Sequence, residues 1–211
     1  MADTTPMSAH RPDYPGLFAL AASQHGMVAA AQARQYGFSR DSLSRLATQG
    51  TLRRLAQGVY RWRDFPGSPF EDIAEAWLRL GESAIASHET ALVLNGLTDL
   101  MPRKHHFVVP RSARGRRRIP TVTLHTRTHP ISPDDVQRVH GIPAMRPEIA
   151  IIEAAAEGAD PTQVDLALRE LHERGTLRAD AFRQWLSTEP ISRSLKVQLT
   201  SALDTLLKAR R

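Results

Sequence analysis

Arginine is the side chain whose abundance and spacing point most directly to a chemistry in this chain. Only three of the 28 basic residues are lysine, and the formal net charge is +6. Residues 1–128 carry the whole excess, because residues 129–211 hold one more acidic group than basic groups. Guanidinium groups bind phosphate oxygens and guanine in a forked geometry, so this distribution favours a polyanion such as nucleic acid as partner. Arginine codons are also frequent in GC-rich genomes, which is the alternative explanation.

The arginines concentrate in two short segments. The first, residues 51–63, contains Arg53, Arg54, Arg61 and Arg63 among aromatic and β-branched residues. The second, residues 111–118, contains Arg111, Arg114, Arg116, Arg117 and Arg118. This second segment has two interpretations: a solvated surface loop, or a second basic patch that contacts phosphate or docks an acidic partner.

Histidine offers the other chemistry that the sequence could support, which is metal binding. His88 and Glu89 begin an HExxH pattern, but Leu92 stands where the second histidine belongs. We therefore interpret the segment after Ser87 as a capped helix start. Two histidine pairs could also meet across strands: His105 with His106, and His125 with His129. Without a nearby carboxylate they are a weak metal signal, and the sequence predicts no metal ion at either place.

Enzymatic catalysis is not predicted. A metal-dependent nuclease needs clustered carboxylates to hold Mg²⁺, and the segments 105–110 and 121–125 contain none. The chain has no cysteine, no phosphate-binding glycine motif and no nucleophile elbow. The sequence therefore predicts no catalytic residues and no cofactor.

Composition is that of an ordinary globular protein. Apolar residues make up 41% of the 211 positions and charged residues 24%, enough for a packed core. No apolar run approaches the roughly 20 residues that span a bilayer, and no signal-peptide pattern opens the chain. We expect a cytoplasmic protein without membrane contact.

The elements that must position the first arginine segment form a recognisable order. Residues 1–14 are predicted to be a disordered tail, and residues 15–63 contain three short helices followed by a hairpin over 51–62. Ser39 is the N-cap of the third helix, Arg40–Thr48. This order is typical of a winged helix-turn-helix, in which the third helix fits a major groove about 12 Å wide and the basic hairpin, the wing, contacts the backbone.

The third helix has two distinct faces. Leu43, Leu46 and Ala47 recur with helical spacing and are predicted to be buried. Asp41 and Arg45 lie on the opposite side with other short polar residues. A buried stripe opposite a polar one is what a DNA-reading helix requires.

The remainder of the chain predicts a second domain. Residues 64–69 read as a proline- and glycine-rich linker, and residues 70–211 as a mixed α/β domain that ends in helices. Helices are expected near 73–80, 88–94, 147–157, 161–174, 178–187 and 193–208, and strands near 105–110, 121–125 and 136–142. Leucine stripes on the late helices are interpreted as core, or as a partner-binding groove. The predicted fold class is α+β.

Several segments resemble the AbiEi-type antitoxins of type IV toxin–antitoxin systems, which are winged-helix transcriptional regulators. In the first domain these are VAAAQARQYGFSRDSLSRLATQG and GTLRRLAQGVYR, the second of which spans Gly50–Arg61. In the second domain they are ASHETALVLNGLTD at 86–99, FVVP at 107–110 and GIPAMRPEIAIIEAAAEG at 141–158. The resemblance covers about residues 15–175 and is weak in the last helices.

The resemblance implies an autorepressor that binds double-stranded DNA at its own promoter. It also implies a nucleotidyltransferase-like toxin, encoded beside the protein, that the antitoxin counters. The implied DNA contacts fall on Arg40, Ser42, Arg45 and Gln49 of the third helix and on Arg53, Arg54 and Arg61 of the wing. Two other functions stay open: a protein–protein adaptor with no DNA role, and a metal-dependent nuclease.

Overall fold

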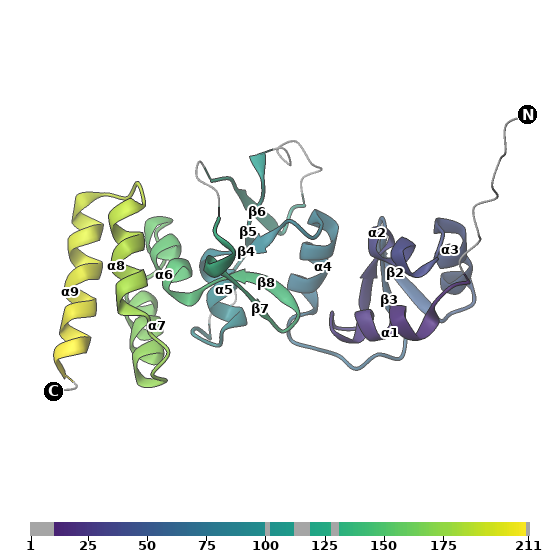
Figure 1. Ribbon diagram of the computed structural model, residues 1–211, viewed down its shortest axis with the longest axis horizontal. Helices are drawn as coiled ribbons and strands as arrows, with labels where there is room; N and C mark the ends of the chain where they lie inside the picture. The colour runs from purple at the N-terminus through teal and green to yellow at the C-terminus, as the bar shows by residue number, and fades with distance from the viewer. Residues whose placement is uncertain (1–10, 100–101, 112–118, 128–130, 210–211) are drawn as a thin grey trace, which may run out of the picture. The chain divides into compact units, whose positions relative to one another are not determined.

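The structure is a computed structural model that describes residues 11–99, 102–111, 119–127 and 131–209. The chain forms two compact units, residues 1–81 and 82–211. Together with the two sheets and the late helices, this organisation gives the expected α+β fold, with a winged-helix region followed by a mixed α/β domain (Figure 1). Within the described residues, no helix is both long enough and apolar enough to cross a membrane.

The N-terminal unit contains short helices around a three-stranded sheet (Figure 1). Its elements are α1 (Tyr14–Ala22), β1 (Met27–Ala29), α2 (Ala30–Ala33), η1 (Arg34–Tyr36), α3 (Arg40–Thr48), β2 (Leu52–Ala56), β3 (Val59–Trp62) and α4 (Glu71–Leu80). The strand order is β1-β3-β2, with both pairs antiparallel. Strand β1 was not expected from the sequence, because three residues beside an alanine-rich helix carry no alternation.

Helix α3 has the predicted bounds and the predicted cap. Ser39 Oγ accepts a hydrogen bond from the Ser42 N–H at 3.1 Å, which satisfies one of the free donors of the first turn. Leu43 and Leu46 enter a core formed by residues of α1, α2, α3 and the sheet. That core also includes Phe38 and Leu52, and it fixes α3 against the β2–β3 hairpin.

The boundary between the two units lies after Gly81 rather than in the expected 64–69 linker. Helix α4 contacts β1 and β3 and belongs to the N-terminal unit. Segment 64–69 is held at both ends, because the buried Arg61 side chain reaches across it to Glu71 at 2.7 Å. Of the predicted tail, residues 1–10 lie outside the described part, and Tyr14 already belongs to α1.

The C-terminal unit is built on a mixed five-stranded sheet with the order β6-β5-β4-β8-β7. Its strands are β4 (Ile85–Ala86), β5 (His105–Val108), β6 (Val122–His125), β7 (Val136–Val139) and β8 (Ile142–Met145), with η3 (Pro133–Asp135) before β7. The pairs β5–β6 and β4–β8 are parallel, and β4–β5 and β7–β8 are antiparallel. The single strand expected over 136–142 is instead a hairpin, because His140 and Gly141 both adopt positive φ and form a two-residue turn.

In the described residues, five helices complete this unit. They are α5 (His88–Leu94), α6 (Pro147–Ala156), α7 (Pro161–Glu173), α8 (Ala179–Thr188) and α9 (Arg193–Ala209). Helix α5 packs on the sheet and on α6, and α6 to α9 pack together beyond it (Figure 1). Of the stripes predicted as core, Val164, Leu168 and Leu171 of α7 and Leu199 and Leu203 of α9 are buried, whereas Leu195 and Leu206 of α9 are only partly buried.

Candidate nucleic-acid interface

The solvent-facing side of α3 is polar, as the sequence predicts. Its exposed residues are Arg40, Asp41, Ser44, Arg45, Thr48 and Gln49. Arg45 lies one turn after Asp41, so a guanidinium donor and a carboxylate acceptor share one face. Guanidinium groups pair with guanine, and carboxylates accept from the cytosine amino group. This face therefore carries the two kinds of group that distinguish the strands of a G·C pair.

The first turns of α3 and the wing enclose one concave surface. A hollow of about 450 Å³ is lined on its polar side by Arg40 and Ser44 from α3 and by Arg54, Gln57 and Gly58 from the hairpin, and elsewhere by residues 29–31, Tyr60 and Leu78. Two guanidinium groups from separate elements thus face the same space. Such a surface suits a phosphate group, which binds forked donors in two-point contacts.

The exposed arginines of α3 and the wing have no carboxylate partner within the described residues. The ion pairs found within 11–81 use Arg61 and Arg79 instead. Positive groups without a counter-charge raise the local potential and attract polyanions. The charge excess of the N-terminal unit is therefore available at its surface.

Arg61 does not lie where a DNA contact was expected. It is only 6% exposed, and its Nη2 donates to the Phe65 and Pro66 carbonyls and to Glu71 Oε1 at 2.9, 3.0 and 2.7 Å. The side chain lies on the face of the sheet opposite to the core residue Tyr60, where its donors satisfy the turn before α4. A group held by three internal acceptors is not free to bind phosphate.

The other residues predicted to contact DNA differ in how free their side chains are and in which face they occupy. Ser42 is partly committed, because its hydroxyl donates to the Ser39 carbonyl at 2.8 Å. Arg53 and Arg54 are both exposed. In the register of the β2–β3 hairpin, Arg53 lies opposite Arg61 and Arg54 lies opposite Tyr60. Adjacent strand residues point to opposite faces, so Arg54 shares the concave surface and Arg53 does not.

The second arginine segment is described only at its start. Arg111 is exposed. The other members, Arg114, Arg116, Arg117 and Arg118, lie outside the described residues. The role of this segment stays a prediction.

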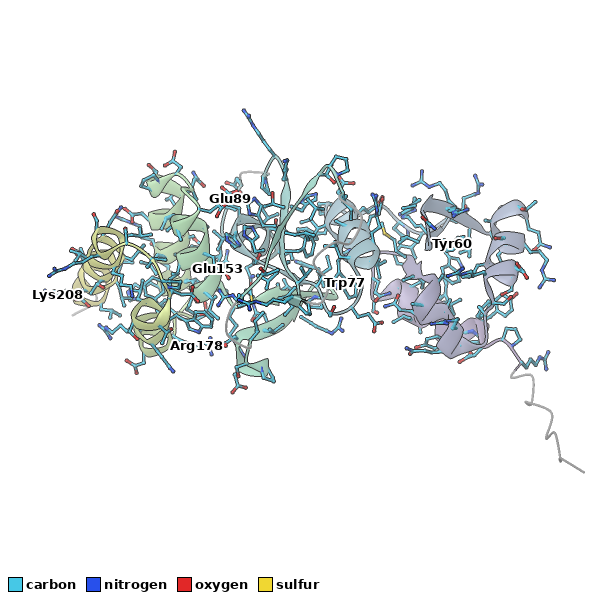
Figure 2. All side chains as sticks on the ribbon, turned by 90° about the horizontal axis from the view of Figure 1, so that it is seen from above. Tyr60, Trp77, Glu89, Glu153, Arg178 and Lys208 are labelled. Carbon is cyan, nitrogen blue, oxygen red and sulfur yellow. The ribbon has the colours of Figure 1, made fainter. Side chains whose placement is uncertain are left out.

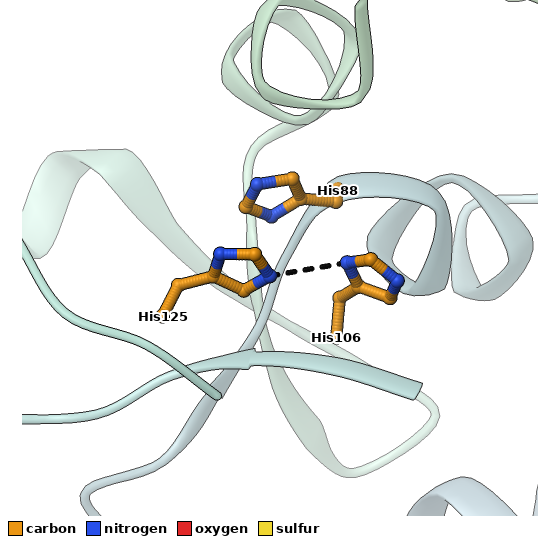
Figure 3. Close-up of side chains that lie close together, drawn as sticks. All are labelled: His88, His106 and His125. Carbon is orange, nitrogen blue, oxygen red and sulfur yellow. Dashed lines mark hydrogen bonds between the residues drawn. The ribbon is translucent and has the colours of Figure 1, made fainter. Parts of the chain in front are cut away.

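The C-terminal unit contains a second polar site, a histidine cluster formed by His88, His106 and His125 (Figure 3). His106 Nδ1 lies 3.1 Å from His125 Nε2. The His88 ring stacks on that of His125, with 3.9 Å between centroids. Burial lowers the pKa of His88 to about 2 and is the largest cause lowering the pKa values of the other two rings. All three imidazoles are therefore neutral at pH 7.

The backbone at His88 is unusual. Its φ is +50°, a left-handed conformation that costs a non-glycine residue about 1–3 kcal/mol. Ser87 was expected to cap α5, but its hydroxyl lies 3.0 Å from His88 Nδ1 and makes no capping bond. The carboxylate of Glu153 on α6 instead accepts from the His88 N–H at 3.3 Å, which supplies the missing cap from a distant element.

Next to the cluster lies a charged network centred on Arg127. The guanidinium pairs with Glu153 and with Glu189, the latter at 2.8 Å, and stands 4.5 Å over the Trp185 ring. Burial raises the pKa of Glu153, and the positive charge of Arg127 opposes that rise. Figure 2 shows Glu153 in the interior of its unit, whereas Lys208 extends outward. A cavity of about 190 Å³ is lined by His88, His125 and all three charged groups.

Sequence reasoning missed this site because its members come from five elements. His106 and His125 are brought together by the parallel β5–β6 pair, which a local pattern does not reveal. The one usable signal was the pair of histidine-bearing strands, and the expected partner His129 lies outside the described residues. Glu153 reads in the sequence as one polar residue of an apolar helix.

Comparison with known families decides what kind of protein carries these two sites. The family described as transcriptional regulator, AbiEi antitoxin, matches residues 17–61. The AbiEi antitoxin C-terminal domain matches residues 84–199, which is more than half of the chain. The chain belongs to the AbiEi antitoxin family. The resemblance inferred from the sequence is thereby confirmed, and an antitoxin or transcriptional-regulator role follows.

The two AbiEi matches include both sites. The first contains α3 and the wing, and the second contains the histidine cluster and the Arg127 network. Neither family description names an enzymatic activity. The N-terminal match ends at Arg61, the residue whose side chain ties the wing to α4.

The fold is also found in a solved structure. The RV2827C protein from Mycobacterium tuberculosis has a TM-score of 0.52 and 16% identity, over 97% of this chain and 80% of the mycobacterial one. At that identity the likeness concerns the fold alone. A search among curated proteins gave no match.

Proposed function

We propose that this AbiEi-family protein is a DNA-binding autorepressor and the antitoxin of a type IV toxin–antitoxin system. The observation that carries the DNA-binding part is the concave surface on which Arg40 and Arg54 lie together without a carboxylate partner among the described residues. In this proposal α3 enters the major groove of the protein's own promoter, and the wing contacts the adjacent backbone.

The division of labour follows from the placement of the side chains. Arg54 and Arg40 line the hollow between wing and helix, and we assign them to phosphate contacts that fix the register. Arg45 and Gln49 lie on the exposed face of α3, and we assign them to base edges. Arg61 is assigned no contact, because its donors are used within the fold.

Fluorescence anisotropy on a duplex from upstream of the protein's own gene tests this assignment, with an unrelated duplex for comparison and a series of salt concentrations. Arg54→Ala should weaken binding to both duplexes and reduce the slope of log K against log salt by about 0.9. Arg45→Ala should instead reduce the preference for the promoter, by about 1–3 kcal/mol at one base pair.

Arg193→Ala is the matched control, because it removes the same charge from an exposed position at the start of α9. It should leave the salt slope unchanged. Equal loss of affinity in Arg193→Ala and Arg54→Ala would show that only the net charge matters. No preference of the unaltered protein for its promoter over the unrelated duplex would refute the regulator assignment.

The antitoxin part of the proposal rests on family membership. We propose as partner a nucleotidyltransferase-like toxin encoded next to this protein, which requires a cytoplasmic location. Co-expression of the two genes should restore the growth that the toxin alone suppresses. The same experiment with Arg54→Ala separates the roles, because neutralisation without promoter binding would indicate that antitoxicity does not require DNA.

A further inference from the structure

Three imidazole rings from three elements converge in the C-terminal unit. His88 begins α5, His106 lies on β5 and His125 ends β6, and one ring nitrogen of each lies within 4.8 Å of the other two (Figure 3). None of these residues is assigned to the DNA interface. His88 is buried and the other two rings are partly buried, and three imidazoles facing one another there need an explanation, because buried polar groups are costly unless they have partners.

The sheet itself fixes two of the rings. In the parallel β5–β6 ladder His106 is opposite Thr123 and Val108 is opposite His125. Residues two apart share a face, so His106 and His125 are diagonal neighbours on the same side of the sheet. The strand register therefore places both side chains on one side of the sheet.

His88 is oriented by groups around it. Its Nδ1 lies 3.0 Å from Ser87 Oγ and 3.8 Å from Glu153 Oε2. A metal-binding histidine commonly presents one ring nitrogen to the ion while a hydroxyl, carbonyl or carboxylate holds the other. The buried Ser87 hydroxyl occupies that supporting position, and the buried Glu153 carboxylate lies beyond hydrogen-bond distance of the same nitrogen.

We propose that His88, His106 and His125 form a binding site for a divalent transition-metal ion of the zinc class. Imidazole nitrogens select Zn²⁺, Co²⁺, Ni²⁺ and Cu²⁺, whereas Mg²⁺ and Ca²⁺ require oxygen ligands. The site is distinct from the DNA interface and lies within the other unit of the chain.

The spacing fits a tetrahedral ion after a small inward movement. Zinc–nitrogen bonds of about 2.0–2.1 Å place ligand nitrogens about 3.3 Å apart. The His106–His125 pair is already at 3.1 Å, so the movement required is mainly that of the His88 ring. The His88 and His125 rings stack with 20° between their planes, so the His88 ring must also turn until one of its nitrogens points at the ion.

His88 and His125 also line the cavity that contains Arg127, Glu153 and Glu157. Glu153 is committed to Arg127 and to the His88 N–H, so the fourth ligand in this proposal comes from the cavity, as water or as the Glu157 carboxylate. With water in that place, three histidines with one exchangeable ligand differ from closed structural zinc sites, in which the protein supplies all four.

The test uses the full-length chain without a histidine tag, titrated with Zn²⁺ in competition with a chromophoric chelator. We expect one equivalent to bind. His106→Gln and His125→Gln should each weaken the affinity by about 100-fold or more, because loss of even a supporting residue costs 10- to 100-fold. His172→Gln, on α7 and outside the cluster, is the control and should bind as the unaltered protein does.

A second measurement keeps the proposal testable if a cluster variant fails to fold. The unaltered protein is loaded with Co²⁺, and its visible spectrum and the ¹⁵N shifts of its imidazoles are recorded. A four-coordinate spectrum with three shifted histidines supports the site. A six-coordinate spectrum, the lack of saturable 1:1 Zn²⁺ binding, or binding retained by both cluster variants would overturn it.

Discussion

Replacement of Arg127 by methionine should be among the most damaging single changes in the C-terminal unit. The Arg127 and Glu153 side chains are 15% and 6% exposed, and they pair directly. Methionine keeps much of the aliphatic volume but removes the charge. Glu153 then retains the His88 N–H at 3.3 Å as its remaining hydrogen-bond donor. A buried charge left without its partner costs about 3–5 kcal/mol, and the lost contact with the Trp185 ring adds to this.

Urea unfolding at pH 7, followed by far-UV circular dichroism and by tryptophan fluorescence, measures this loss. The double variant Arg127→Met/Glu153→Gln should recover at least half of it, because no uncompensated charge remains. The stability lost relative to the unaltered protein should also become smaller as the pH falls. Without Arg127, burial and the charge of Glu189 raise the pKa of Glu153 against the His88 N–H alone, so the folded state of the variant takes up a proton that the unfolded state binds only at lower pH.

Two results would refute the reasoning on Arg127. A loss of less than about 1 kcal/mol in the single variant would mean that the pair is solvated, as surface ion pairs are. A double variant no more stable than the single one would mean that Arg127 acts through packing and not by neutralising Glu153.

Three further predictions concern the N-terminal unit and the histidine cluster. Gly26→Ala should destabilise the N-terminal unit by about 2 kcal/mol or more in urea unfolding, because Gly26 has a φ of +78° and an added Cβ would lie 2.4 Å from the Phe65 ring. Arg61→Met should lower thermal stability while leaving the salt slope of DNA binding unchanged, since Glu71 is its ion-pair partner; a reduced slope would return Arg61 to the DNA interface. Because the pKa of His88 falls from 6.5 to about 2 on folding, the unfolded chain binds the extra proton, and the free energy of unfolding should decrease by up to about 1.4 kcal/mol per pH unit below pH 6.5. His88→Asn, which keeps a residue that tolerates positive φ, should show a weaker pH dependence in the same titration.

The sequence was sufficient where structure depends on neighbours along the chain. Ser39 marked the start of α3 because a hydroxyl before an amphipathic run caps a helix, and the structure contains that bond. Gln57 and Gly58 marked the turn between β2 and β3 for a similarly local reason. The apolar spacing of Leu43 and Leu46 identified the buried side of α3.

The sequence was insufficient where a side chain depends on a distant partner. Arg53 and Arg61 look alike as wing arginines, yet only Arg61 meets a carboxylate, because Glu71 arrives from the next helix. The histidine cluster required knowledge of which strands pair and in which direction. His140 and Gly141 form a turn because both accept positive φ, which histidine does only occasionally, so the β7–β8 hairpin read as one strand.

The ion pair between Arg61 and Glu71 determines how freely the wing can move. If segment 64–69 were a flexible linker, the hairpin could move independently of α4 when it bound a duplex. Instead the Arg61 guanidinium donates hydrogen bonds to the carbonyls of Phe65 and Pro66 and to Glu71 at the start of α4. These bonds connect α4 to β3. We therefore expect the hairpin and α4 to move as one body, so that a force on the tip of the hairpin is transmitted to α4.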